Sequence, residues 1–223
     1  KEVRQRLLFT FLMLVVIRVG SCLPIPGVDA TYLSSFFAAL DASGMGFVNA
    51  LTGGSFSSMS LFALSVSPTI TASIIMQLLT IAIPKLEEMQ KEGEEGRKKI
   101  NEYSRYLTIV LAIIESTAMA VGLGGQGLIL AEHRNFLGYL TVVAAMTAGT
   151  SLLMWIGEKI TEKGVGSGIS IILVINILSR LPQDLMSLYE RFMSGKSVAV
   201  AAVAAIIILA VIVATVILVL ILN

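Results

Sequence analysis

Side chains able to do covalent or metal chemistry are few and scattered in this sequence. It has a single histidine, His133, and a single cysteine, Cys22, which excludes an intramolecular disulfide framework. A membrane serine protease needs a serine beside a base, but charge patterning puts Ser167 and His133 on opposite sides of a membrane. The sequence contains no His-Glu-x-x-His pair, and one histidine with one cysteine makes no zinc site without several carboxylates. We therefore expect no enzyme activity, cofactor or metal.

The connector 157–168 is rich in glycine. Gly164, Gly166 and Gly168 resemble the spacing of a phosphate-binding loop, but no strand precedes them and no Lys-Ser or Lys-Thr pair follows. We expect a tight turn between two helices.

Polar or charged residues fall within three of the apolar stretches. Glu115 lies near the middle of one stretch, where a charge is costly, so it should face a bundle interior. It is either a functional residue or a structural glutamate bonded to a hydroxyl of a neighbouring helix. The stretch from Ser65 to Ser73 carries a hydroxyl at nearly every other position, which indicates either a helix-packing seam or a polar passage. Arg18 falls near the end of another stretch and is expected to reach the headgroups.

The chain that must position these residues is strongly apolar. Hydrophobic residues make up 56 % and charged residues 14 % of its 223 positions, with a mean hydropathy of +0.87. A water-soluble core of this size needs less apolar surface. The run 198–222 alone has 25 uncharged residues, and about 20 cross a bilayer core. We expect an all-α, polytopic transmembrane bundle with six spans, at about 7–23, 67–84, 106–123, 136–156, 168–181 and 198–222.

Basic residues predict the orientation of these spans. The loop 85–105 carries six lysines and arginines, whereas the stretch 21–67 carries none. Basic loops stay in the cytoplasm during insertion, so this loop and the N-terminus are expected to be cytoplasmic. A net charge of +1, with acidic residues interleaved among the basic ones, argues against direct DNA binding.

Four stretches of the sequence together resemble a known family. They are 18–29 (RVGSCLPIPGVD), 53–79 (from the Gly53-Gly54 pair to Leu79), 154–170 (from Met154-Trp155-Ile156-Gly157-Glu158 to Gly168-Ile169-Ser170) and the charged loop 91–100. In this order they resemble the bacterial SecY family, the central channel subunits of the Sec protein translocase. That family has ten spans in two inverted halves, so the resemblance implies that these six spans belong to an inverted-repeat channel of which this chain holds about half.

The resemblance assigns roles to particular residues. The segment 47–62, which we call the plug segment, matches the short re-entrant helix that closes the channel, with Asn49, Leu51, Gly53, Gly54, Ser55 and Phe56 as its site residues. From the residues alone, this interrupted stretch is either folded back toward the protein centre or laid on the headgroups. Four residues match the aliphatic ring that narrows the pore, and we call them the ring residues: Val66, Ile70, Ile169 and Leu173. Each pair is four residues apart and so shares a helix face. Thr71 and Glu115 match polar positions of the lateral gate.

The implied function is passive conduction of unfolded polypeptides across the bacterial inner membrane, with lateral release of transmembrane segments into lipid. Implied partners are SecE-like and SecG-like small membrane subunits, the SecA motor ATPase, the ribosome, signal peptides and secretory polypeptides. The sequence departs from the family pattern at Ser65, Ser67 and Thr69, where glycine, methionine and tyrosine are common. The main alternative is a secondary transporter with broken helices, for which a buried carboxylate such as Glu115 would be typical.

Overall fold

The computed structural model describes residues 2–28, 36, 49, 51–127, 129, 135–192, 213, 215 and 217. The chain divides into two units, Lys1–Leu178 and Ser179–Asn223. Everything that follows concerns the first unit, together with the length of the helix that continues past Leu178. Apart from three isolated positions, the expected span 198–222 lies outside the described residues, as do residues 47, 48 and 50 of the plug segment.

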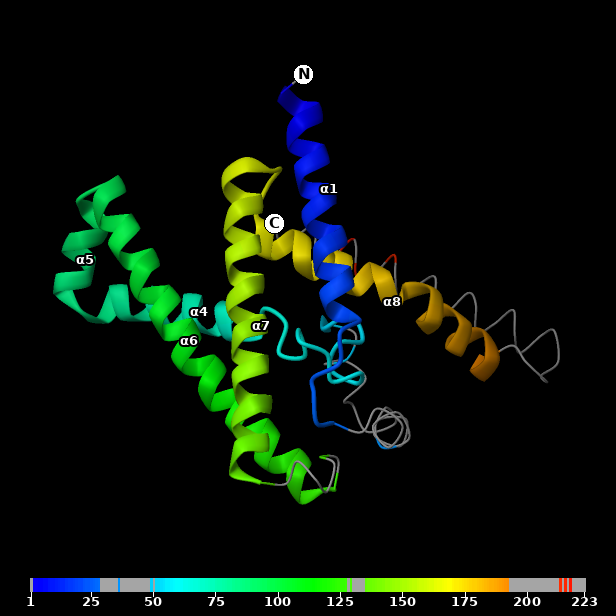
Figure 1. The fold of residues 1–223 in the computed structure, drawn as a ribbon. Helices are drawn as coiled ribbons and strands as arrows, with labels where there is room; N and C mark the ends of the chain where they lie inside the picture. Colours follow the sequence, from blue (N-terminus) through cyan, green and yellow to red (C-terminus); the bar gives the residue numbers. More distant parts are fainter. Residues whose placement is uncertain are drawn as a thin grey trace. The chain divides into compact units, whose positions relative to one another are not determined.

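Regular secondary structure in the described ranges is entirely helical, which confirms the all-α class. In chain order the helices are α1 (Glu2–Ser21), α4 (Ser67–Ala82), α5 (Pro84–Lys91), α6 (Glu94–Gly125), α7 (Phe136–Lys163) and α8 (Gly168–Phe192), as Figure 1 shows.

Length and composition single out membrane-crossing helices. In the described part, the segments Glu94–Gly122 of α6 and Phe136–Lys163 of α7 are each long and apolar enough to cross a bilayer, while α4 and α5 together form a bent pair at 101°. The apolar part of α8, Gly168–Gln183, is shorter. The 20-residue α1 includes Glu2 and three arginines. These helices account for a polytopic membrane protein.

Helix boundaries differ from the expected ones on the charged side. Much of the expected loop 85–105 is helical, since α6 already begins at Glu94. Glutamates at positions 94 and 95 complement the positive end of the helix dipole, and the lysines and arginines that follow are good helix formers. The bend between α4 and α5 follows from Pro84, which has no N–H to donate, and from the extended backbone of Ile83. The turn between α7 and α8 is confined to 164–167.

The segment after α1 pairs with the end of the plug segment. Ile25 N–H donates to the Met59 carbonyl at 3.0 Å, and Leu61 N–H donates to the Leu23 carbonyl at 2.9 Å. These bonds flank an antiparallel bridge between Pro24 and Ser60. Because Ile25 and Met59 are fully buried, the plug segment is anchored inside the first unit. This placement favours the folded-back interpretation over a loop on the headgroups.

Two apolar clusters hold the first unit together. The first cluster joins the plug segment to α6 and α7 through Ile25, Met59, Ala63, Ala120, Val142 and Met146. The second cluster joins α1, α7 and α8 to the residues before α4 through Ile17, Phe62, Val66, Leu153, Ile156, Ile160 and Ile172. Two glycines permit the close packing, because a Cβ on Gly20 would overlap the Phe62 ring and one on Gly149 would overlap the Leu61 carbonyl.

Candidate functional site

The structure brings the four ring residues into one apolar cluster. Val66, at the start of α4, is 1 % exposed and belongs to the second cluster. Ile70 of α4 and Ile169 and Leu173 of α8 are half-buried and pack against the same cluster. Two helices nearly a hundred residues apart in sequence therefore present their aliphatic side chains to a common point, beside Phe62 at the end of the plug segment.

The described part of the plug segment is a run of turns held by its own hydrogen bonds. Asn49 and Leu51 are helical, and residues 52–59 are turns, so the described residues beyond 51 differ from the expected short helix. The Asn49 side chain accepts from Ser57 N–H at 3.2 Å, and the Thr52 hydroxyl accepts from Phe56 N–H at 3.2 Å. Gly53 and Gly54 have φ of +66° and +87°, which explains the need for glycine at this tight reversal. Phe56 packs against the first cluster, whereas Ser55 is buried and its hydroxyl has no hydrogen-bond partner among the described residues.

A buried polar contact, which the sequence did not predict, lies next to Gly53. Asn176 of α8, 3 % exposed, donates from Nδ2 to Ser65 Oγ at 3.2 Å. Its Oδ1 accepts from Arg18 Nη1 of α1 at 3.5 Å. Arg18 is half-buried, and its guanidinium contacts Asn176 of α8, which agrees with a structural role for this residue.

Thr71 and Glu115, the expected gate residues, share no hydrogen bond in the described part of the chain. The Thr71 hydroxyl donates to the Ser67 carbonyl of its own helix at 3.1 Å. Glu115 is half-buried on α6, and no described hydroxyl binds its carboxylate. Its neighbour Ser116 instead shares a 3.2 Å hydrogen bond with Thr147 of α7. The structural alternative for Glu115, a bond to a neighbouring hydroxyl, thus finds no support among the described residues.

A polar pocket of about 430 Å³ adjoins the ring residue Ile169. Ten of its thirteen lining residues are polar or charged: Thr69, Ser73, Asn101, Ser104, Arg105, Thr108, Glu158, Lys159, Thr161 and Glu162. Thr69 is 6 % exposed, and its hydroxyl has no hydrogen-bond partner among the described residues. Thr69 and Ser73 line this pocket, whereas Ser65 bonds Asn176 of α8, so the start of α4 has features of both a polar passage and a packing seam.

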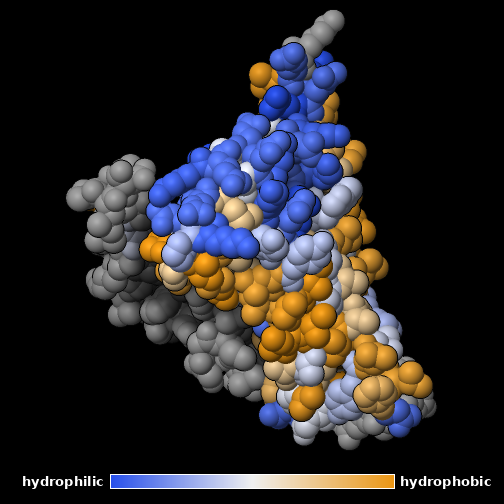
Figure 2. Space-filling view, turned by 90° about the vertical axis from the view of Figure 1, so that its left-hand side faces the viewer, coloured by the Kyte–Doolittle hydropathy of each residue, from blue (hydrophilic) through white to orange (hydrophobic). Residues whose placement is uncertain are grey.

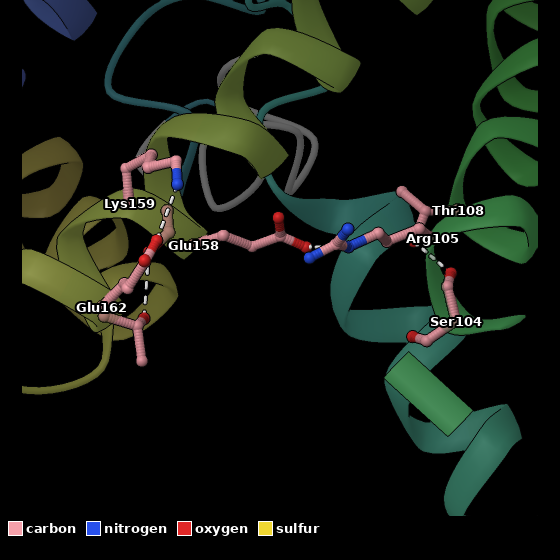
Figure 3. A network of polar contacts seen from close by, with 8 residues as sticks. Ser104, Arg105, Thr108, Glu158, Lys159 and Glu162 are labelled. Atoms are coloured by element: carbon pink, nitrogen blue, oxygen red, sulfur yellow. Dashed lines mark hydrogen bonds and ion pairs between the residues drawn. The ribbon is translucent and has the colours of Figure 1, made fainter. Parts of the chain in front are cut away.

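Two ion pairs border this pocket, and Figure 3 shows how their side chains meet. Arg105 of α6 reaches across to Glu158 of α7, with 2.6 Å between Nε and Oε1. Lys159 pairs with Glu162 within α7, also at 2.6 Å. Because positive and negative groups balance, the pocket is polar without a strong preference for either charge. The described residues contain no group of three or more histidine, cysteine or acidic side chains able to hold a metal ion.

Comparison with known sequences agrees with this arrangement. A family model described as SecY matches residues 60–223. The protein translocase subunit SecY of Escherichia coli K12 is 44 % identical over 198 residues, covering 87 % of this chain and 44 % of that protein. The same subunit of Buchnera aphidicola is 45 % identical over 198 residues, covering 87 % of this chain and 55 % of the relative. The chain spans about half the length of the curated relatives it matches.

Solved structures share the fold. Sec61 in the canine ribosome–channel complex from the endoplasmic reticulum aligns with a TM-score of 0.54 at 21 % identity, covering 86 % of this chain and 39 % of Sec61. A second channel structure, which concerns the SecY plug domain in the closed state, aligns with a TM-score of 0.52. The alignment covers 88 % of this chain and 39 % of the solved one. Since the family model matches residues 60–223, most of the sequence, the chain belongs to the SecY family.

Proposed function

We propose that this chain forms the N-terminal part of a channel that conducts unfolded polypeptides across a membrane. The observation that carries the proposal is the convergence of the ring residues from α4 and α8 on one apolar cluster beside the plug segment. In a member of the SecY family, this is the arrangement expected at a pore constriction. The remaining ring residues would come from the part of the relatives that this chain does not span.

An aliphatic neck suits a passage that must accept any side chain. Water and ions avoid a narrow apolar constriction, whereas a chain in transit fills it. The polar pocket beside Ile169 would offer hydroxyl groups and balanced charges to the backbone of the substrate polypeptide before it enters the constriction. The plug segment, anchored in the first cluster, would close the idle channel.

The proposal includes lateral release of transmembrane segments between α4 and α6 and later spans. Glu115 of α6 and Thr71 of α4 would stabilise the closed gate only modestly, since no hydrogen bond joins them in the described structure. A gate held weakly can open toward lipid when an apolar segment partitions into it.

The chain's location in a bacterial inner membrane, with a cytoplasmic N-terminus, is part of the same proposal. Arg6 of α1 and Lys163 of α7 line one hollow, and Val165 N–H donates to Thr10 Oγ1 at 3.3 Å. The start of α1 and the end of α7 thus lie together. Figure 2 shows hydrophilic side chains gathered toward one end of the visible face, next to a hydrophobic band. Basic segments on one side of an apolar band support a single cytoplasmic face.

The partners we propose are SecE-like and SecG-like membrane subunits, the SecA motor ATPase, the ribosome, signal peptides and secretory polypeptides. One structural relative is a ribosome–channel complex. The proposal assigns no catalytic residue, because movement of the substrate would be driven by such partners.

Site-specific photo-crosslinking tests the proposal. A photo-reactive residue replaces Ile70 in the full-length protein, which is then presented with a secretory precursor stalled in transit. Leu152 of α7, 40 % exposed on the outside of the first unit, provides the control. Strong adducts at position 70 and few at 152 are expected. Equal labelling at both positions, in a protein that still translocates the precursor, would contradict a constriction at the ring residues. It would favour the alternative function, a secondary transporter.

A further inference from the structure

We infer that Asn176 is the positioning residue of the plug segment: its amide ties α1 to the residue before Val66, and it holds the Arg18 guanidinium against which, together with Asn176 Cα and Cβ, Gly53 packs. This inference depends on the proposed channel function. We call the contact of Asn176 with Arg18 and Ser65 the Asn176 bridge.

Hydrogen-bond chemistry sets the direction of the bridge. A guanidinium only donates, so the amide oxygen must face Arg18 Nη1, at 3.5 Å. The amide nitrogen then faces Ser65 Oγ, at 3.2 Å, and that hydroxyl accepts. Both ends of a side chain that is 3 % exposed are therefore paired, as a buried amide requires.

The backbone of the plug segment lies directly on the bridge. A Cβ added to Gly53 would come within 3.0 Å of both Arg18 Nη1 and Asn176 Cα. Gly53 also has a φ of +66°, which side chains rarely adopt. A larger residue at position 53 would collide with the Asn176 bridge. Movement of the plug segment away from the bridge would expose the bridge to solvent. The bridge and the closed position of the plug segment therefore depend on each other.

Ser65 connects the bridge to the ring residues. It precedes Val66, and its φ of +52° lies in the left-handed region that a non-glycine residue occupies only when its surroundings hold it there. The hydrogen bond from Asn176 is one such restraint, because it fixes the Ser65 side chain. The same amide thereby helps to fix the backbone conformation of Ser65, which directs the Val66 side chain toward the constriction.

Opening would exchange this bridge for water. Each polar atom of the bridge can bond to water once the plug segment moves, so the bridge sets where the plug segment rests without forbidding its release. Replacing Asn176 with leucine, which has a similar volume, removes the hydrogen bonds that Asn176 makes with Arg18 and with Ser65. We expect the idle leak to rise about fivefold or more, a factor typical of losing one buried hydrogen bond.

The test uses the full-length channel with its partner subunits in proteoliposomes. Ion leak in the idle state and translocation of a secretory precursor are measured on the same preparation. A third readout follows the plug segment itself, using Ser55→Cys in a Cys22→Ser background. Ser55 is 2 % exposed and its hydroxyl has no partner in the described structure, so this change removes no hydrogen bond. Faster labelling of position 55 by a water-soluble maleimide reports displacement of the plug segment.

Matched variants separate positioning from general damage. Asn176→Asp keeps an acceptor for Arg18 and can accept from the Ser65 hydroxyl, so it should seal like the parent protein. Val174→Leu, at an exposed position of the same helix, should also leave sealing unchanged. Ser65→Gly removes the hydroxyl but relieves the backbone, and together with Asn176→Leu it should leak no more than Asn176→Leu alone.

The outcomes are distinct. Raised leak and faster labelling in Asn176→Leu, with sealing kept in Asn176→Asp, support the bridge. Unchanged leak and labelling in Asn176→Leu, while the precursor is still translocated, overturn it and leave the channel function standing. Failure of the parent protein to translocate any precursor overturns the channel function instead. A leak equally large in Asn176→Asp would also refute the bridge, since any change at this position would then be damaging.

Discussion

Gly149 of α7 is expected to tolerate replacement poorly. A Cβ at this position would overlap the carbonyl oxygen of Leu61 and lie 2.8 Å from its carbonyl carbon. These are backbone atoms, and Leu61 is itself tied by its N–H to the Leu23 carbonyl at 2.9 Å. Leu61 cannot move away from Leu23 without breaking that bond. Gly149→Ala therefore forces overpacking, which typically costs about 1–3 kcal/mol.

A second glycine provides the control for this change. Nothing lies within 4 Å of the position that a Cβ would take on Gly122 of α6. Alanine there should be neutral, or stabilising by up to about 1 kcal/mol, because it lowers the entropy of the unfolded chain. Gly149→Ala gains the same helix propensity but loses more through the overlap. The contrast between the two variants should therefore equal the overpacking cost, about 1–3 kcal/mol.

Thermal unfolding of the purified full-length protein in one detergent, followed by circular dichroism, measures this contrast. The midpoint of Gly149→Ala should fall below that of the parent protein, whereas Gly122→Ala should match or exceed it. Equal midpoints for the two variants would refute the packing of Leu61 against α7, and with it the anchoring of the plug segment's end.

Three further predictions address other contacts. Thr161→Val should lower the free energy of unfolding by about 1 kcal/mol, because the Thr161 hydroxyl accepts a hydrogen bond from the Gly168 N–H at the start of α8, at 2.8 Å. The control in the same unfolding assay is Thr141→Val, since the exposed Thr141 hydroxyl bonds only its own helix. The pair between Arg105 and Glu158 joins α6 to α7 but is partly exposed, so a double-mutant cycle should give a coupling of at most about 0.2–1 kcal/mol that shrinks with added salt. Glu115→Gln should be tolerated while Glu115→Leu alters gating in a translocation assay; loss of all transport with glutamine, at normal expression, would favour a proton-coupled transporter.

Helix content and the meeting of the ring residues could be predicted from sequence for a simple reason. Long apolar runs demand helices in a membrane, and residues four apart on a helix share a face. Val66 with Ile70 and Ile169 with Leu173 obey this rule, and the structure packs both pairs into one cluster. Which two helices face each other is not a local property. That step came from the family resemblance.

The ends of the helices and the shape of the plug segment were less predictable. The expected span begins at about 106, where the apolar run begins, whereas α6 begins at Glu94, because the charged residues after Gly93 are good helix formers outside the bilayer. The turns after Leu51 depend on Gly53 and Gly54 at positive φ and on hydrogen bonds to Asn49. Such local side-chain bonds compete with a helix and are difficult to weigh from composition.

Asn176 escaped the sequence analysis because its role depends on distant residues. Arg18 lies 158 positions away and Ser65 lies 111 positions away. An asparagine in an apolar helix gives only a general hint that a partner exists. Ser65 stands where the family commonly has glycine, and the structure gives it a φ of +52°, a conformation that serine adopts only with some external restraint. A search for the residue supplying that restraint would have led to α8.

The plug segment is thus held by two kinds of contact that respond differently to water. Phe56 and Met59 lose apolar burial when the segment leaves, a cost that water does not relieve. The Asn176 bridge loses hydrogen bonds that water replaces almost fully. The apolar contacts should therefore contribute most of the free energy of closing, while the bridge selects one resting position among several of similar burial. Substitutions in the first cluster should accordingly change how often the channel opens, and substitutions in the bridge should change how tightly it seals when closed.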